Sequence, residues 1–166
     1  GGHAATTAVA VAEEIKSVGL NWDLYWIGVR NAIEGKKVVT LESEVLPRLG
    51  VKFVPLTTGR LQRRFTIWTI PSILKIPIGI IQAFYYLVKI RPSAILSFGG
   101  FAAFPVVLNA KLLGIPVIIH EQTSEAGRSN LYTAKFASVI AISRDESRKY
   151  FPKGKCELTG NPVMNE

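Results

Sequence analysis

The sequence is poor in the residues that build disulfide or metal sites. Its single cysteine, Cys156, cannot form a disulfide within the chain, which excludes a disulfide-stabilised small domain and is compatible with a reducing compartment. The two histidines show neither an HxxxH spacing nor a cluster with cysteine, so we expect no metal site. There is no internal repeat and no low-complexity segment. A globular domain of ordinary size is the remaining class.

Acidic residues are missing from the middle of the chain. Between Val45 and His120 there is no Asp or Glu, whereas nine basic residues fall there. The rest of the chain carries 11 basic and 12 acidic residues, so this middle segment accounts for the whole net charge of +8. Such asymmetry indicates an anionic partner, either a phosphate, an anionic lipid or a nucleic acid. The alternative is a charged surface that only keeps the protein in solution.

Short apolar runs alternate with longer helical patterns along the chain, and 48% of the residues are hydrophobic. Strands are predicted at residues 24–27, 52–56, 94–97, 117–119, 139–142 and 156–158. Helices are predicted at residues 4–17, 41–49, 71–90, 105–113, 129–136 and 145–150. This alternation predicts an α/β fold, with a Rossmann-like parallel sheet and helices on both of its faces.

Polar and glycine-rich segments follow the predicted strands, where ligands of such folds bind. Gly99-Gly100 and His120-Glu121-Gln122-Thr123 each follow an apolar strand. Gly1-Gly2-His3 leads into the first helix, where free N–H groups attract an anion and a histidine can act as a general base. Two glycine loops that face one crevice would suit a pyrophosphate. The alternatives are tight helix–strand packing for the glycines and a loop histidine without a role.

The predicted helix Pro71–Ile90 is unusually apolar. Its uncharged run Ile76–Val88 has 13 residues, fewer than the about 20 that a transmembrane helix needs, and Pro77 is expected to kink or interrupt it. Aromatic, aliphatic and basic residues precede it, a mixture typical of interfacial membrane binding. The predicted membrane contacts are Arg60, Arg63, Arg64, Ile67, Trp68, Ile70, Leu74 and Lys75. The alternative is an oversized core helix beside a solvated loop.

Several short motifs, in this order and spacing, resemble the MurG family of transferases within glycosyltransferase family 28. They are Gly1-Gly2-His3, Ser97-Phe98-Gly99-Gly100-Phe101, Gly114-Ile115-Pro116-Val117, His120-Glu121-Gln122, Gly127-Arg128-Ser129-Asn130 and Gly160-Asn161-Pro162-Val163. The resemblance implies the N-terminal half of a GT-B fold and covers essentially the whole chain. Residues 1–159 would form an acceptor-binding domain that lacks its first strand. Residues 160–166 would begin the interdomain linker, with the C-terminal donor domain absent.

The resemblance also implies an activity. Family members transfer N-acetylglucosamine from UDP-N-acetylglucosamine to the 4-hydroxyl of lipid-linked N-acetylmuramoyl-pentapeptide (lipid I), with inversion and without a cofactor, at the cytoplasmic face of the plasma membrane. By this likeness His3 is the candidate base. The acceptor and its diphosphate would meet Gly1, Gly2, Gly99, Gly100, Phe101, His120, Glu121, Gln122 and Asn130. The donor would meet Gly1, Gly2, Thr123 and Met164.

Three positions depart from the family pattern, which commonly has Tyr at Phe101, Asn at Thr123 and Arg at Met164. These departures put the donor contacts in doubt and leave the predicted fold unchanged. We expect the isolated chain to be inactive, because a donor domain would be missing. The alternatives are another transferase with a lipid acceptor, such as a diacylglycerol glycosyltransferase or a split transferase subunit, and a non-catalytic basic module. Without an RNA or DNA motif, we expect no nucleic-acid partner.

Overall fold

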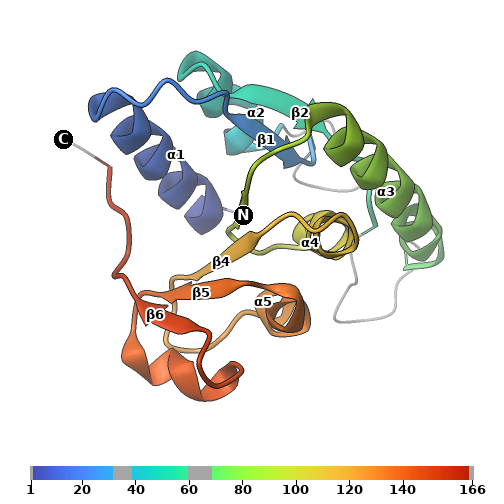
Figure 1. The fold of residues 1–166 in the computed structure, drawn as a ribbon. Helices are drawn as coiled ribbons and strands as arrows, with labels where there is room; N and C mark the ends of the chain where they lie inside the picture. Colours follow the sequence, from blue (N-terminus) through green and yellow to red (C-terminus); the bar gives the residue numbers. More distant parts are fainter. Residues whose placement is uncertain (1, 32–38, 60–68, 165–166) are drawn as a thin grey trace. The chain divides into compact units, whose positions relative to one another are not determined.

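The computed structural model describes residues 2–31, 39–59 and 69–164, except for the side chains of residues 2–3 and 69–73. Helices and strands alternate along the chain, as Figure 1 shows. The chain divides into two compact units. Gly1–Leu56 and Pro162–Glu166 make the first unit, and Thr57–Asn161 makes the second.

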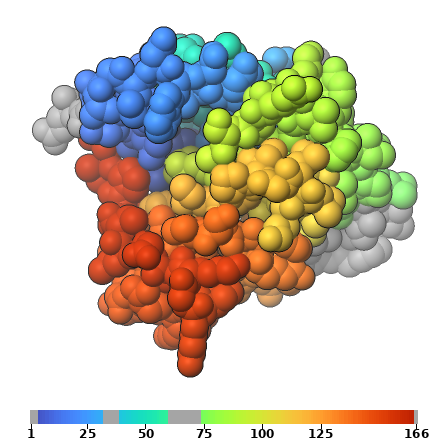
Figure 2. Space-filling model, in the orientation of Figure 1, coloured from blue at the N-terminus to red at the C-terminus, as the bar shows by residue number. Residues whose placement is uncertain are grey.

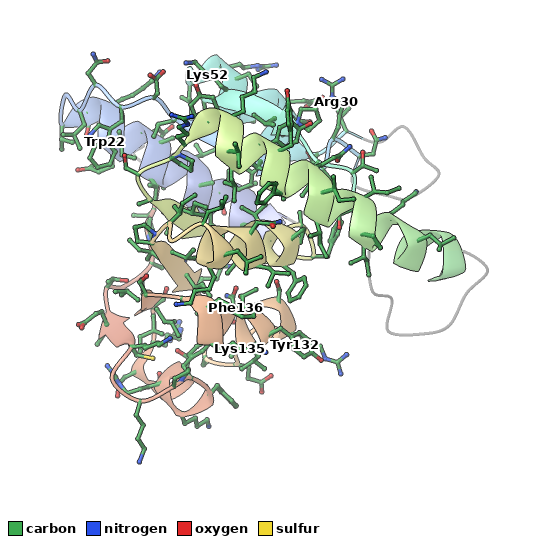
Figure 3. All side chains as sticks on the ribbon, turned by 45° about the vertical axis from the view of Figure 1, so that its right-hand side comes forward. Trp22, Arg30, Lys52, Tyr132, Lys135 and Phe136 are labelled. Atoms are coloured by element: carbon green, nitrogen blue, oxygen red, sulfur yellow. The ribbon has the colours of Figure 1, made fainter. Side chains whose placement is uncertain are left out.

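The first unit contains a short parallel sheet and two helices. Its elements are α1 (Gly2–Ser17), β1 (Tyr25–Gly28), α2 (Leu41–Arg48) and β2 (Lys52–Pro55). Strands β1 and β2 pair in parallel, with Tyr25 opposite Lys52. The Lys52 Nζ lies 2.6 Å from Asp23 Oδ1 in an exposed ion pair. Figure 3 labels Lys52 on this unit. Thr40 caps α2 by accepting a hydrogen bond from the Ser43 amide, which satisfies one of the free donors of the first turn.

The second unit contains a sheet of four parallel strands in the order β3-β4-β5-β6. The strands are β3 (Ile95–Ser97), β4 (Val117–Glu121), β5 (Val139–Ile142) and β6 (Cys156–Leu158). The helices are α3 (Thr69–Ile90), α4 (Ala103–Leu112) and α5 (Arg128–Thr133), with the 3-10 helices η1 (Ala134–Phe136) and η2 (Asp145–Tyr150). Ile119 and Ile140 pair at the centre of this sheet and are fully buried. Because all four strands are parallel, their carboxyl ends lie at one edge of the sheet.

Helices α3 and α4 pack against each other within the second unit (Figure 1). The buried Asn109 amide on α4 donates hydrogen bonds to the Ile80 carbonyl on α3, at 2.9 Å, and to the Pro105 carbonyl of its own helix, at 2.8 Å. The segment after β2 also contacts α3, since the Thr57 amide donates to Gln82 Oε1 and Gly79 lies close to Thr58. A side chain on α4 and a loop therefore both fix the position of α3.

The predicted strands and helices are all present, with bounds that differ by a few residues, and the α/β class is confirmed. Helix α3 continues through Pro77, where an interruption was one expectation. A proline costs a helix interior about 3 kcal/mol, and burial of Ala83 and Leu87 later in α3 helps to offset this cost. The strands belong to two parallel sheets, whereas a single sheet was expected. None of the described helices is long and apolar enough to cross a membrane.

Candidate functional site

The candidate site lies at the carboxyl edge of the four-stranded sheet. Strand β3 leads to Gly99-Gly100, β4 ends at Glu121, Ser143 follows β5, and Gly160 comes shortly after β6. Ligands of parallel α/β sheets bind beyond the carboxyl ends of the strands, which we call the strand-end rule. This edge brings together loops that are up to about 60 residues apart in the sequence. Among the described residues, no cluster of His, Cys, Asp and Glu side chains could hold a metal ion.

The glycine loop after β3 places a helix N-terminus at this edge. Gly99 and Gly100 have φ values of +80° and +85°, a backbone region that strongly favours glycine. The Ser129 hydroxyl donates to the Gly100 carbonyl at 2.6 Å and so ties this loop to α5. Helix α4 then begins at Ala103, without a side-chain cap and without an acidic residue in its first turn. Such a helix end suits an anion, because its first N–H groups and its dipole favour negative charge.

Glu121 organises the loop that follows β4. Its side chain is buried, and its two carboxylate oxygens accept four hydrogen bonds from the loop and from α5. Oε1 accepts from the amide and the hydroxyl of Thr123, at 3.1 and 2.7 Å. Oε2 accepts from the Gly127 amide at 2.8 Å and from Asn130 Nδ2 at 2.9 Å. The carboxylate therefore satisfies the donors of its own loop, and the Thr123 hydroxyl is used within the protein.

Asn130 connects this loop to the glycine loop. Its Nδ2 donates to Glu121 Oε2 and to the His120 carbonyl, at 2.9 and 3.2 Å. Its Oδ1 is buried and has no hydrogen-bond partner in the described part of the chain. That oxygen faces Gly99 so closely that a Cβ added there would lie only 2.7 Å away. The position of Asn130 therefore requires glycine at residue 99.

His120 is buried at the end of β4, and the Phe98 ring meets its ring edge-on at 6.0 Å. Its Nε2 lies 3.2 Å from the Ser143 hydroxyl and 3.4 Å from the Gly160 carbonyl. Burial lowers the pKa of His120 below its ordinary value, although the Gly160 carbonyl and the Glu121 carboxylate oppose this shift. The imidazole is therefore neutral at pH 7.

The structure brings part of the predicted site together within the second unit. Gly99, Gly100, Phe101, His120–Thr123 and Asn130 all lie at or beside the carboxyl edge of the sheet. Gly1, Gly2, His3 and Met164 belong to the first unit, so their approach to the other site residues stays a prediction. Gly1 and the His3 side chain lie outside the described residues.

The predicted membrane contacts are described only in part. Arg60, Arg63, Arg64, Ile67 and Trp68 lie outside the described residues, as does the side chain of Ile70. Leu74 is exposed on α3, and Lys75 is half-buried.

Two hydroxyl groups of the site were not predicted. Ser129 holds the glycine loop, and Ser143 contacts both His120 and Gly160. Ser143 directly follows a predicted strand, so the strand-end rule that singled out His120 would have found it as well. Ser129 lies inside a predicted helix, and no local signal marks its contact with Gly100.

Known proteins resemble this chain along its whole length. A family model described as "Glycosyltransferase family 28 N-terminal domain" matches residues 1–142. The UDP-N-acetylglucosamine–N-acetylmuramyl-(pentapeptide) pyrophosphoryl-undecaprenol N-acetylglucosamine transferase of Thermoanaerobacter sp. (strain X514) is 34% identical over 100% of this chain and 43% of its own length. The protein of the same name from Legionella pneumophila (strain Lens) is also 34% identical, over 99% of this chain and 43% of its own.

A solved structure agrees with these matches. The crystal structure of Acinetobacter baumannii MurG superimposes with a TM-score of 0.70 and 24% sequence identity, over 99% of this chain and 43% of that one. The chain thus spans less than half the length of these relatives. Because the family model covers residues 1–142, the chain belongs to glycosyltransferase family 28 and corresponds to the N-terminal domain of that family.

Proposed function

We propose that this chain is the acceptor-binding domain of an inverting glycosyltransferase. The complete enzyme would move N-acetylglucosamine from UDP-N-acetylglucosamine to the 4-hydroxyl of lipid-linked N-acetylmuramoyl-pentapeptide. The observation that carries the proposal is the similarity of the whole chain to transferases named for this reaction. The glycine loop at the start of α4 supports it, because this loop suits the diphosphate of such an acceptor.

In this proposal the residues of the carboxyl edge divide into two groups. Gly100 is exposed, whereas Gly99, Phe101 and Gln122 are half-buried, and these four would contact the acceptor or its diphosphate. Glu121 and Asn130 are buried and bonded to their own loop, so they would shape the site. An anion at the start of α4 typically gains about 0.3–1 kcal/mol from the helix dipole.

Residues of the first unit would supply the remaining groups. We assign His3 as the base that takes the proton from the acceptor hydroxyl, and Gly1 and Gly2 as backbone that approaches both substrates. Thr123 and Met164 would lie near the donor. The Thr123 amide and hydroxyl are both bonded to Glu121, and the hydroxyl also lies 2.6 Å from the Glu125 carbonyl, so the methyl group of Thr123 would meet the donor.

The acceptor is a membrane lipid, and α3 carries a surface that fits a bilayer. Large apolar side chains recur every three or four residues on its exposed side, at Leu74, Ile78, Ile81, Tyr85 and Val88. We call this set the apolar stripe. Leu74 and Ile81 are 66% and 70% exposed, and Figure 2 shows α3 in green along the surface of the second unit, next to α4 in yellow.

Charge near the apolar stripe favours an anionic membrane. Lys75 and Lys89 flank it on the same helix, and each basic residue close to an anionic surface adds about 1 kcal/mol of binding. With residues 60–70 included, as the sequence suggests, the surface would hold the enzyme peripherally on the cytoplasmic face of the plasma membrane.

An activity assay of the full-length protein tests the reaction. Purified enzyme is given UDP-N-acetylglucosamine and lipid I, and transfer of the sugar is followed by chromatography. We expect transfer by the wild type and a loss of about 100-fold or more in kcat for His3→Ala. No transfer by the folded full-length protein would refute the proposed reaction. Unchanged kcat/KM in His3→Ala would remove only the assignment of the base.

Flotation with lipid vesicles tests the apolar stripe. The double variant Leu74→Ser with Ile81→Ser should lose binding to vesicles that contain anionic phospholipid, whereas Leu158→Ser should keep it. Leu158 is a matched control because it is 58% exposed on β6 and lies outside the stripe. Equal binding by the two variants would show that α3 does not hold the protein on the membrane.

A further inference from the structure

Three side chains converge on the carbonyl oxygen of Gly160, just after the last strand of the sheet. The Ser143 hydroxyl donates to it at 3.1 Å, and the Thr159 hydroxyl lies 3.3 Å away. His120 Nε2 is 3.4 Å from the same oxygen and 3.2 Å from Ser143 Oγ. These groups come from the ends of β4, β5 and β6, so one carbonyl joins three neighbouring strands.

The number of available hydrogens determines how this cluster is bonded. The Ser143 hydroxyl has one hydrogen, and donating it to Gly160 leaves its oxygen free to accept from His120. We assign the hydrogen of His120 to Nε2, because this tautomer supplies a donor to both Ser143 and Gly160. Every hydrogen in the cluster is used in this arrangement.

Burial and packing fix the position of the His120 ring, so the ring can hold a hydrogen-bonded partner in place. Its side chain is only 6% exposed, and Phe98 packs against its ring. Gly160, in contrast, lies outside the helices and strands and has a φ of +77°. The residue after it, Asn161, is the last residue of the second unit, and Pro162 already belongs to the first. The bonded carbonyl therefore lies where the chain passes from one unit to the other.

We propose that His120 and Ser143 form a clamp on the Gly160 carbonyl that fixes the direction in which the chain leaves the second unit, and that His120 is thereby a positioning residue of the transferase. This inference rests on the proposed function for its effect on activity. Because residues 160–166 are proposed to begin the linker to the donor domain, the direction of this segment would affect how acceptor and donor are aligned in the complete enzyme. A misalignment of about 1 Å lowers a rate by about 100-fold.

The test uses the full-length protein and two independent measurements. Hydrogen exchange of the amides of residues 159–163 reports on the clamp, and kcat with the acceptor KM reports on alignment. His120→Ala and Ser143→Ala should speed the exchange and lower kcat by about 10- to 100-fold, with the acceptor KM changed less than about twofold.

Two further variants separate the clamp from a general loss of structure. His120→Gln should restore slow exchange and most of kcat, because its amide N–H can occupy the place of Nε2. Thr159→Val removes only the exposed contact to Gly160 and should behave like the wild type in both measurements.

Each other outcome overturns a defined part of the inference. Unchanged exchange in both alanine variants would show that there is no clamp. Faster exchange with unchanged kcat would refute the positioning role. A raised acceptor KM with unchanged exchange would mean that His120 binds the acceptor directly. If the wild type transfers no sugar, the proposed function fails, and the exchange measurement still decides whether the clamp exists.

Discussion

Replacing Gly99 by alanine tests the link between the two loops at the carboxyl edge. The added methyl group would lie 2.7 Å from Asn130 Oδ1, in a backbone conformation with φ of +80°. Gly100 is a matched control, because its φ is +85° and an added Cβ would meet nothing within 4 Å. Both substitutions strain the backbone, but only the first displaces a buried side chain.

The expected losses differ by the hydrogen bonds of Asn130. A non-glycine residue in the left-handed region costs about 1–2 kcal/mol, which applies to both variants. At residue 99 the methyl group would also push the Asn130 amide away from Glu121 Oε2 and the His120 carbonyl. A neutral hydrogen bond contributes about 1 kcal/mol and one to a charged group about 1.5–3 kcal/mol. We therefore expect a loss of about 3.5–6 kcal/mol for Gly99→Ala and about 1–2 kcal/mol for Gly100→Ala.

Urea denaturation followed by circular dichroism measures both losses. A double-mutant cycle with Asn130→Ala isolates the contact, because without the amide the new methyl group has nothing to displace. The combined variant should lose about 2.5–4 kcal/mol less than the sum of the single variants, because the bonds of Asn130 are counted twice in that sum. Equal losses for Gly99→Ala and Gly100→Ala, or strict additivity in the cycle, would refute the reasoning.

Three further predictions concern other contacts of the second unit. Because burial lowers the pKa of His120, this histidine is protonated at a higher pH in the unfolded chain than in the folded protein. The neutral, buried form of His120 therefore contributes stability that is fully present above pH 6.5 and is lost as the pH falls toward the folded-state pKa. Denaturation at several pH values should show this loss in the wild type and not in His120→Gln. Asn109→Leu leaves the Ile80 carbonyl without its side-chain donor and should lower the free energy of unfolding by about 1–3 kcal/mol, measured by urea denaturation. An unchanged free energy of unfolding would mean that this hydrogen bond does not stabilise the protein. Gly79→Ala should speed hydrogen exchange of the amides of residues 56–59, because the added Cβ would lie 2.7 Å from the Cβ of Thr58. Unchanged exchange would show that residues 56–59 adjust to the methyl group without loss of structure.

Local patterns predicted the position of the site well. The strand-end rule placed Gly99-Gly100 and His120–Thr123 at one edge of a parallel sheet, and the observed β5 and β6 have the predicted bounds. Alternation of apolar runs and helical segments is sufficient for this, because it depends only on periodicity and turn residues.

The orientation of individual side chains could not be predicted in the same way. An acidic residue after an apolar strand suggested a group that meets a ligand, yet the Glu121 carboxylate turns back to the amides of its own loop. His120 similarly bonds to Gly160, 40 residues further along the chain. Such contacts depend on how separate loops pack, and periodicity carries no information about this. The role of His3 and the contacts of Met164 remain predictions.

The amide of Asn109 gives the second unit a mechanical connection between two surfaces. It fastens α3, which carries the apolar stripe, to α4, whose first turn follows the glycine loop. A displacement of α3 would therefore also shift the first turn of α4, because closely packed elements transmit strain to one another. Contact of α3 with a lipid surface and the position of the glycine loop would then be coupled through the packing of α3 on α4, in which Asn109 supplies a buried hydrogen bond.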